Sequence, residues 1–239
     1  MEQSSAADVH PASQSVSGLS WKGLVQVFSK PGEFFEKLKN NPRILVPYIV
    51  AVILYAVSFV LISDLLVQAQ LESPQMAERM QGQPATPQVR QALKITSIAF
   101  PTVFMALYPI VAAWLASFFG GFIMGAKARY KAVLSVILYG NIIFAVGTLI
   151  HAALMLAKGS VGVTLSLGVL AAGQGFDSIP FVALSKIGLF NIWEIIAVGI
   201  GLAAVYNFPR NKGYWTAVLS IGLISVLHII LTGVGGLLG

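Results

Sequence analysis

The sequence predicts an all-α integral membrane protein: a compact bundle of five transmembrane helices preceded by an amphipathic interfacial N-terminal segment. Of the 239 residues, 56% are hydrophobic and only 10% are charged, whereas a soluble domain carries roughly 25% charged residues. Five apolar runs follow one another. Each is near or above the roughly 20 residues that an α-helix needs to cross a hydrocarbon core. Most of the chain is therefore expected to face lipid or other helices rather than water.

The chain before the first apolar run divides into two parts. Residues 1–18 are rich in Ser, Ala and Gln and lack apolar periodicity, so we expect a disordered cytoplasmic tail that is not a signal peptide. Residues 19–43 place apolar and aromatic side chains at helical spacing on both sides of Pro31-Gly32. Five basic residues lie among them: Lys22, Lys30, Lys37, Lys39 and Arg43. This pattern is typical of a helix at headgroup level that contacts anionic lipid. The other interpretation is a helix packed on the protein's own cytoplasmic loops.

The transmembrane domain is predicted to cover residues 44–238. Its five spans are expected at about 44–67, 95–124, 132–157, 181–206 and 215–238. The second span contains Pro101 and Pro109, and it is long enough to begin with an interfacial turn or to be kinked at Pro109.

Two other segments separate these spans. Residues 161–172 are apolar but too short to cross, so we expect a re-entrant or interfacial segment, and a count of six spans would need this stretch to cross. Residues 68–94 are polar and hold three prolines, which indicates a water-exposed loop with partial helical content.

The distribution of Lys and Arg predicts the orientation, because cytoplasmic loops collect basic residues. Ten of the 15 lie in the N-terminal segment and in the loops after spans two and four, and five lie on the opposite side. The N-terminus is therefore expected in the cytoplasm and the C-terminus outside. The net charge of +6 has the same explanation, since the basic residues are scattered among short loops, and no nucleic-acid partner is expected.

Small residues predict where the helices pack closely. Span two carries Ser117, Gly121 and Gly125 at a spacing of four, span three carries Gly140 and Gly147, and span four carries Ala197, Gly199 and Gly201. The expected result is a tight bundle, and a homodimer face is the alternative use of such rows.

No enzyme motif is present in the sequence. There is no Gly-x-Ser-x-Gly turn, no His-Glu-x-x-His, no Gly-x-Gly-Asp and no phosphate-binding Gly-rich loop followed by Lys-Ser/Thr. The chain also lacks cysteine, which excludes thiolate chemistry. We expect a protein without enzymatic activity.

Four carboxylate and histidine side chains lie within the predicted spans: Asp64, His151, Glu194 and His228. A rise of about 1.5 Å per residue puts Asp64 and His151 near the outer rim, and Glu194 near the midplane. Histidine and carboxylate side chains bind Zn²⁺ and also relay protons. The hypothesis is one shared site for a divalent metal or a proton, with no other cofactor. The other interpretation leaves Asp64 and His151 solvated at the interface, and Glu194 hydrogen-bonded to Asn191, Asn141 or the backbone.

Several segments together resemble the bacterial branch of the Yip (Ypt/Rab-interacting protein) domain family. They are Phe28-Ser-Lys-Pro31-Gly-Glu-Phe34-Phe35, Asn41-Pro42, residues 120–131, Leu189-Phe190-Asn191-Ile192-Trp193 and Gly199-x-Gly201-Leu202. The resemblance covers about residues 20–238. It implies five spans, a cytoplasmic N-terminus and an outward C-terminus, here in a bacterial inner membrane. Eukaryotic members associate with Rab-type GTPases and contain an Asp-Leu-Tyr-Gly-Pro motif, which this chain lacks.

Three functions are compatible with these observations. The first is a non-enzymatic membrane protein that organises the membrane or binds lipid or membrane-protein partners. The second is a small transporter or a metal- or proton-binding protein that uses the intramembrane histidines and carboxylates. The third, an unrecognised lipid-modifying enzyme, has the least support. Convergence of the four ionisable residues would favour the second, and their dispersal the first.

Overall fold

The computed structural model describes residues 21–174 and 178–238, so the predicted tail at residues 1–18 lies outside the described residues. Within them the secondary structure is helical, with a single antiparallel bridge between Ser166 and Gly188. Five helical segments are long and apolar enough to cross a membrane. They are α3 (Leu45–Leu71), α5 (Pro87–Ser117) with its π-helical continuation η1 (Phe118–Ile123), α6 (Tyr130–Lys158), α8 (Leu189–Tyr206) and α9 (Arg210–Leu238). The predicted all-α membrane fold with five spanning helices is confirmed.

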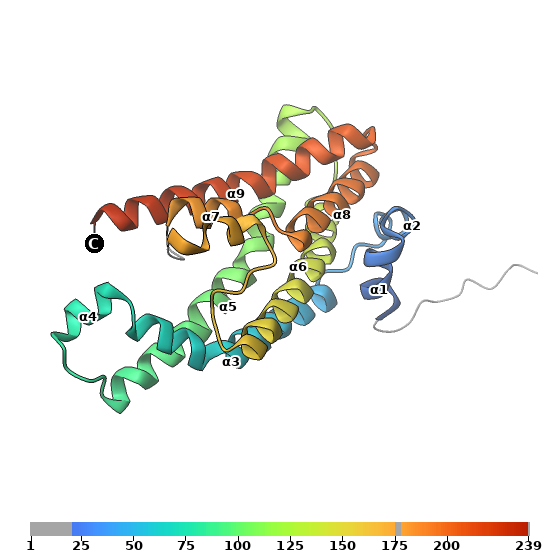
Figure 1. Ribbon diagram of the computed structural model, residues 1–239. Coiled ribbons are helices and arrows are strands. Elements are labelled where there is room, and N and C mark those ends of the chain that lie inside the picture. The colour runs from blue at the N-terminus through green and yellow to red at the C-terminus, as the bar shows by residue number, and fades with distance from the viewer. Residues whose placement is uncertain (1–20, 175–177, 239) are drawn as a thin grey trace, which may run out of the picture.

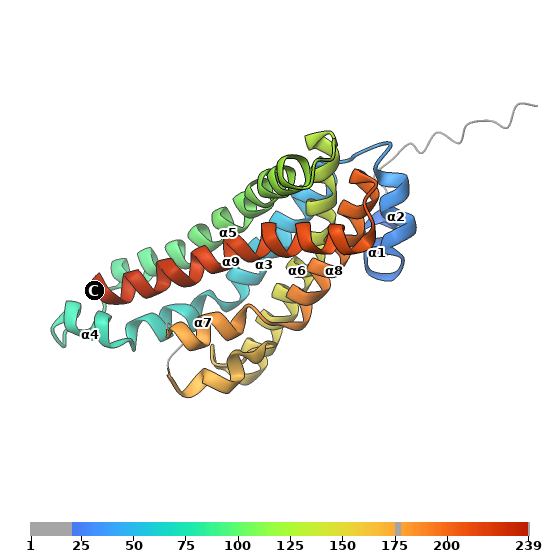
Figure 2. The ribbon, with the colours of Figure 1, turned by 90° about the horizontal axis from the view of Figure 1, so that it is seen from above.

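Helix α6 is the centre of the bundle. In its most apolar stretch 72% of the residues are buried, against 17% in α5 and 22% in α9. It packs against α3, α5 and α8, while α9 lies alongside α5 and α8 (Figures 1 and 2). The exposed apolar faces of α5 and α9 are therefore the surfaces that meet lipid.

Glycines allow the closest helix contacts. A side chain at Gly140 of α6 would overlap Val198 of α8, and one at Gly201 would overlap Val136. Gly213 of α9 lies directly against the backbone of Gly199. The small residues of spans three and four therefore lie at helix contacts, as expected for helices that pack without a hydrophobic driving force.

The prediction that Gly121 and Gly125 of span two allow close packing against another helix is wrong. A side chain at Gly121 would meet only the carbonyl oxygen of Ala126, at 3.7 Å, and Gly125 has open space around it. Gly125 instead has a φ of +72°, which lets the chain turn after η1. The glycine that contacts another helix is Gly120, which lies against the ring of Tyr206.

The segment 68–94 contains more helix than the sequence predicted. Helix α3 continues to Leu71, a short helix α4 (Pro74–Met80) follows, and α5 already begins at Pro87. Ser73 and Thr86 cap α4 and α5 by accepting hydrogen bonds from backbone N–H groups, and a proline follows each of them. A capping hydroxyl followed by proline starts a helix rather than a loop.

The predicted fourth span, 181–206, is interrupted. It contains the end of a short helix, α7 (Ile179–Ser185), a break at 186–188, and α8 from Leu189. The backbone around the break pairs with the segment before the 3₁₀-helix η2 (Leu167–Gln174). Leu167 N–H donates to the Ile187 carbonyl and Leu189 N–H to the Leu165 carbonyl. This pairing satisfies the polar groups of an irregular segment at the end of the membrane domain, and η2 packs on α7 rather than crossing.

The N-terminal segment packs on the bundle. Helices α1 (Trp21–Ser29) and α2 (Pro31–Leu38) lie against α6 and α8, at the end opposite to α4 (Figure 1). Val27 and Phe35 are fully buried, and the centroid of the Phe34 ring lies 4.7 Å from the centroid of the Tyr139 ring. Protein rather than lipid therefore covers the apolar face. These contacts are with the spanning helices α6 and α8 rather than with the loops considered above, and the position of the segment at headgroup level stays a prediction.

Candidate functional site

Two of the four predicted site residues contact lysines. Asp64 on α3 accepts a 2.6 Å hydrogen bond from Lys94 of α5, and its side chain is 83% exposed. His228 on α9 accepts a hydrogen bond through Nδ1 from the Lys186 ammonium at 2.8 Å, because an ammonium can only donate. Neither residue lies beside the other.

The other two are held by neutral partners. The Nε2 atom of His151 donates to the carbonyl oxygen of Val163 and so ties the loop after α6 to that helix. Glu194 of α8 is 2% exposed and accepts a 3.3 Å hydrogen bond from the Asn141 amide. Asn141 is one of the partners that the sequence proposed for Glu194.

The four residues thus do not form one group. Among the described residues, no three His, Asp or Glu side chains come together in an arrangement that could hold a metal ion. The depth of each residue follows from the helical rise, but its direction around the helix axis does not. The shared metal or proton site therefore finds no support in the geometry.

A buried polar network joins three spanning helices instead. The Tyr55 hydroxyl of α3 donates to the Asn141 side-chain oxygen at 3.1 Å, and the Asn141 amide nitrogen donates to Glu194. Tyr55 and Asn141 have no exposed surface. Ionised carboxyl groups at such depth are costly and often mark a functional position. Tyr55 was not predicted as a site residue, because a tyrosine hydroxyl within an apolar run carries no distinguishing signal.

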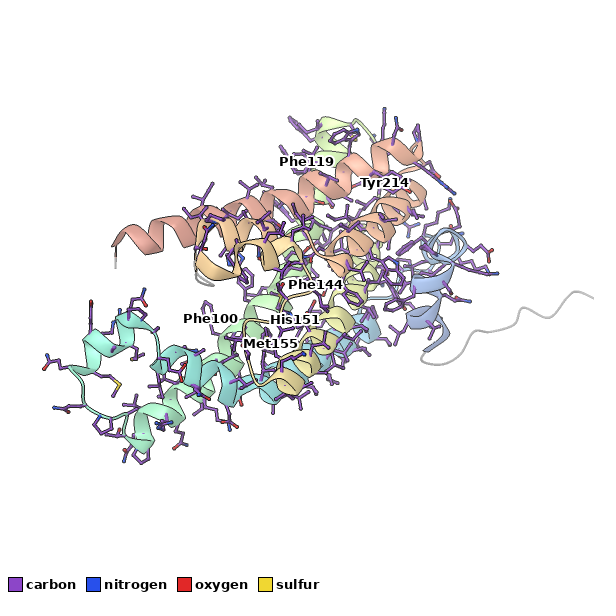
Figure 3. All side chains as sticks on the ribbon, in the orientation of Figure 1. Phe100, Phe119, Phe144, His151, Met155 and Tyr214 are labelled. Atoms are coloured by element: carbon purple, nitrogen blue, oxygen red, sulfur yellow. The ribbon has the colours of Figure 1, made fainter. Side chains whose placement is uncertain are left out.

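A groove of about 870 Å³ lies at the end of the bundle that carries α4. It is formed by the last turns of α3, by α6, by residues 161–166, by α7 and by the first turn of α8. Its larger apolar residues include Leu66, Phe144, Met155, Phe181 and Phe190, and its polar ones include Thr148, His151, Ser166, Lys186 and Asn191. Figure 3 labels Phe144, His151 and Met155, which follow one another along α6.

Local hydrogen bonds shape the wall formed by residues 161–166. His151 holds Val163, the hydroxyls of Thr164 and Ser166 lie 2.6 Å apart, and Ser166 pairs with Gly188. The break between α7 and α8 thus brings the 161–166 segment and Lys186 to the same groove. A continuous fourth helix from residue 181 would remove this pairing.

The buried network lies beneath the groove. Phe144 lines the groove, and its ring centroid is 6.4 Å from that of Tyr55. Asn191 also lines the groove, and it precedes Glu194 by three residues, about one helical turn. One layer of side chains therefore separates the groove from the Tyr55–Asn141–Glu194 network.

Lys186 is the lysine of the groove. It is half-buried, and burial lowers the pKa of its ammonium. No ion pair joins it to a carboxylate within residues 21–174 and 178–238. Within the same residues no Asp or Glu side chain lines the groove. The sequence analysis counted this lysine only among the basic residues of the outer side, although a basic residue near the start of the predicted fourth span could have indicated a site.

The comparison with known proteins identifies a family but no individual relative. No curated protein and no solved structure matches the chain significantly. The model of the Yip1 domain family matches residues 25–232, which include α2 to α8, part of α1 and most of α9, together with the groove and the buried network. The chain therefore belongs to the Yip1 domain family.

Proposed function

We propose that this Yip1-domain protein is a non-enzymatic membrane protein that binds a membrane lipid in the groove between α3, α6, α7 and α8. The observation that carries the proposal is the groove itself. Its volume of about 870 Å³ lies within the roughly 300–1,000 Å³ of ligand pockets, and such pockets combine apolar walls with a few polar groups.

The surroundings of the groove favour a lipid over a water-soluble ligand. The elements beside it carry exposed apolar residues, with Leu170 of η2 75% exposed and Ile179 of α7 53% exposed. Such residues are costly in water but are solvated by hydrocarbon. A ligand that enters from the same surface is itself expected to be an amphiphile.

The test is lipid retention by the full chain in mild detergent, measured by native mass spectrometry. The double variant Thr148→Trp/Ser185→Trp narrows the groove, and each hydroxyl that it removes bonds only a carbonyl of its own helix. The control, Thr102→Trp/Ser225→Trp, replaces equivalent hydroxyls outside the groove lining. Loss of the retained lipid in the first variant alone is the expected result.

Equal retention in both variants would contradict the proposal. The same spectra report the mass of the assembly, so they also test the homodimer that the small-residue rows suggested.

A small transporter is the second candidate, and the buried Tyr55–Asn141–Glu194 network favours it. Carboxyl groups inside a bundle are a recurring component of proton relays. Proton flux into dye-loaded liposomes that is lost in Glu194→Gln would support this candidate. Metal content of the purified protein, compared with His151→Ala, tests the metal-binding form of the same hypothesis.

We further propose that the α1–α2 end lies in the cytoplasm, in a bacterial inner membrane, where basic side chains such as Lys37 contact anionic headgroups. The excess of Lys and Arg in the segments of this end supports the orientation. The chain has no cysteine, so single cysteines report sidedness cleanly. A membrane-impermeant maleimide is expected to label Gln83→Cys but not Glu36→Cys in intact spheroplasts, and the reverse pattern would invert the orientation.

A further inference from the structure

The Lys186 ammonium is held at the groove by a residue of a different span. Its Nζ atom donates to Nδ1 of His228 on α9 at 2.8 Å. Since Nδ1 accepts this hydrogen bond, the proton of the neutral ring lies on Nε2. The His228 ring also packs edge-on against Phe104 of α5, with 6.3 Å between the centroids. The lysine is thus positioned by a histidine that is itself held between helices.

Within residues 21–174 and 178–238, no negative side chain balances the charge of Lys186 at the groove. The residues that line it include one lysine and one histidine, and within the described part of the chain no carboxylate lines it or pairs with Lys186. A half-buried ammonium near apolar walls is costly unless an anion or several acceptors compensate it. An ammonium has three N–H donors, and the contact with His228 uses one of them. An anionic group on a ligand would complete this arrangement.

The groove has an ionic end at Lys186 and apolar walls, and a phospholipid has an ionic headgroup and apolar acyl chains. Lys186 lies at the break between α7 and α8, whereas most of the large apolar side chains of the groove come from the spanning helices α3, α6 and α8 and from α7. An ionic group at the lysine would therefore leave the apolar part of the same molecule along these walls.

We propose that the groove takes an anionic phospholipid, whose phosphate contacts Lys186 and whose acyl chains follow the apolar walls. This assignment rests on the proposed function and names the chemical class of its ligand. The ligand is an amphiphile rather than a soluble phosphate, because most of the surface that lines the groove is apolar.

The experiment compares binding of phosphatidylglycerol and diacylglycerol, which has no phosphate, with identical acyl chains to the full chain in detergent. We expect the wild type to prefer phosphatidylglycerol roughly tenfold, as is usual for one charge-assisted hydrogen bond. Lys186→Gln should abolish the preference without changing diacylglycerol binding, and Lys186→Arg should retain it. The control Lys158→Gln removes an exposed lysine at the end of α6, outside the groove lining, and should leave the preference unchanged.

The outcomes separate the two proposals. Equal binding of both lipids by the wild type, with lipid still lost from Thr148→Trp/Ser185→Trp, would overturn the headgroup assignment and keep the proposed function. Binding of neither lipid would overturn both. Glycerol phosphate that displaces phosphatidylglycerol from the wild type at comparable concentration would show that a soluble phosphate is the ligand, and would overturn the phospholipid assignment.

Discussion

Replacement of Asn141 by leucine should destabilise the bundle through its neighbours rather than through a cavity. Leucine has nearly the shape of asparagine, so the packing around α6 changes little. The substitution removes two hydrogen bonds at once, because the Asn141 side chain accepts one from Tyr55 and donates one to Glu194. The Tyr55 hydroxyl and a Glu194 oxygen are then left inside the bundle without this partner.

The loss in free energy of unfolding can be estimated from these two hydrogen bonds. Hydrogen bonds between membrane helices contribute on average about 0.6 kcal/mol and at most about 1.7 kcal/mol each. We therefore expect Asn141→Leu to lower the free energy of unfolding by about 1 to 3 kcal/mol, with the upper part of the range reached if the stranded groups find no water. Tyr55→Phe removes one bond and should cost about half as much.

The assay is unfolding by sodium dodecyl sulfate in mixed micelles, followed by tryptophan fluorescence. The control is Thr148→Val on the same helix, whose hydroxyl bonds only the Phe144 carbonyl of its own helix. Tyr55→Phe should cost less in the Asn141→Leu background than in the wild type, because its partner is already gone. Strictly additive costs, or an Asn141→Leu protein as stable as the control, would refute the network.

Two further predictions concern helix packing. Gly213→Ala should destabilise the bundle, because its Cβ would overlap the backbone carbonyl of Gly199, which cannot move aside. Gly222→Ala, on the same helix with open space around it, should be neutral or stabilising by up to about 1 kcal/mol, and thermal unfolding of both variants checks the contrast. Phe35→Ala should weaken the packing of α1 and α2 on the bundle by about 3–5 kcal/mol. It should therefore expose the N-terminal helices to limited proteolysis, whereas Val25→Ala, at a position that is 67% exposed, should not. Equal proteolysis of the two would indicate that Phe35 does not hold the segment.

The number of spanning helices could be predicted because it depends on the length and composition of each apolar run. The boundaries depend on interactions between distant residues. The break before Leu189 exists because the backbone near Gly188 pairs with Ser166, and hydropathy carries no information about that pairing. The helix starts at Pro74 and Pro87 are readable from the preceding Ser73 and Thr86, but prolines in a polar segment are equally typical of a loop.

The site could be predicted only in part, for a related reason. The sequence placed Glu194 correctly as a buried carboxyl with Asn141 among its partners. It grouped Glu194 with Asp64, which proved to be exposed beside Lys94. Depth is set by position along a helix, whereas contact requires the rotation of each helix about its axis. That rotation is decided by packing, above all by the glycines against which neighbouring side chains rest.

The network across α3, α6 and α8 has a consequence for how the chain is made. Asn141 follows Tyr55 by 86 residues and precedes Glu194 by 53. When α6 enters the membrane during translation, Tyr55 is already there to pair with its amide. At about 5–20 residues per second, Glu194 is synthesised about 3–10 seconds later. The Glu194 carboxyl group is thus the last member of the network to enter the membrane. Until then the Asn141 amide lies in the bilayer without this acceptor.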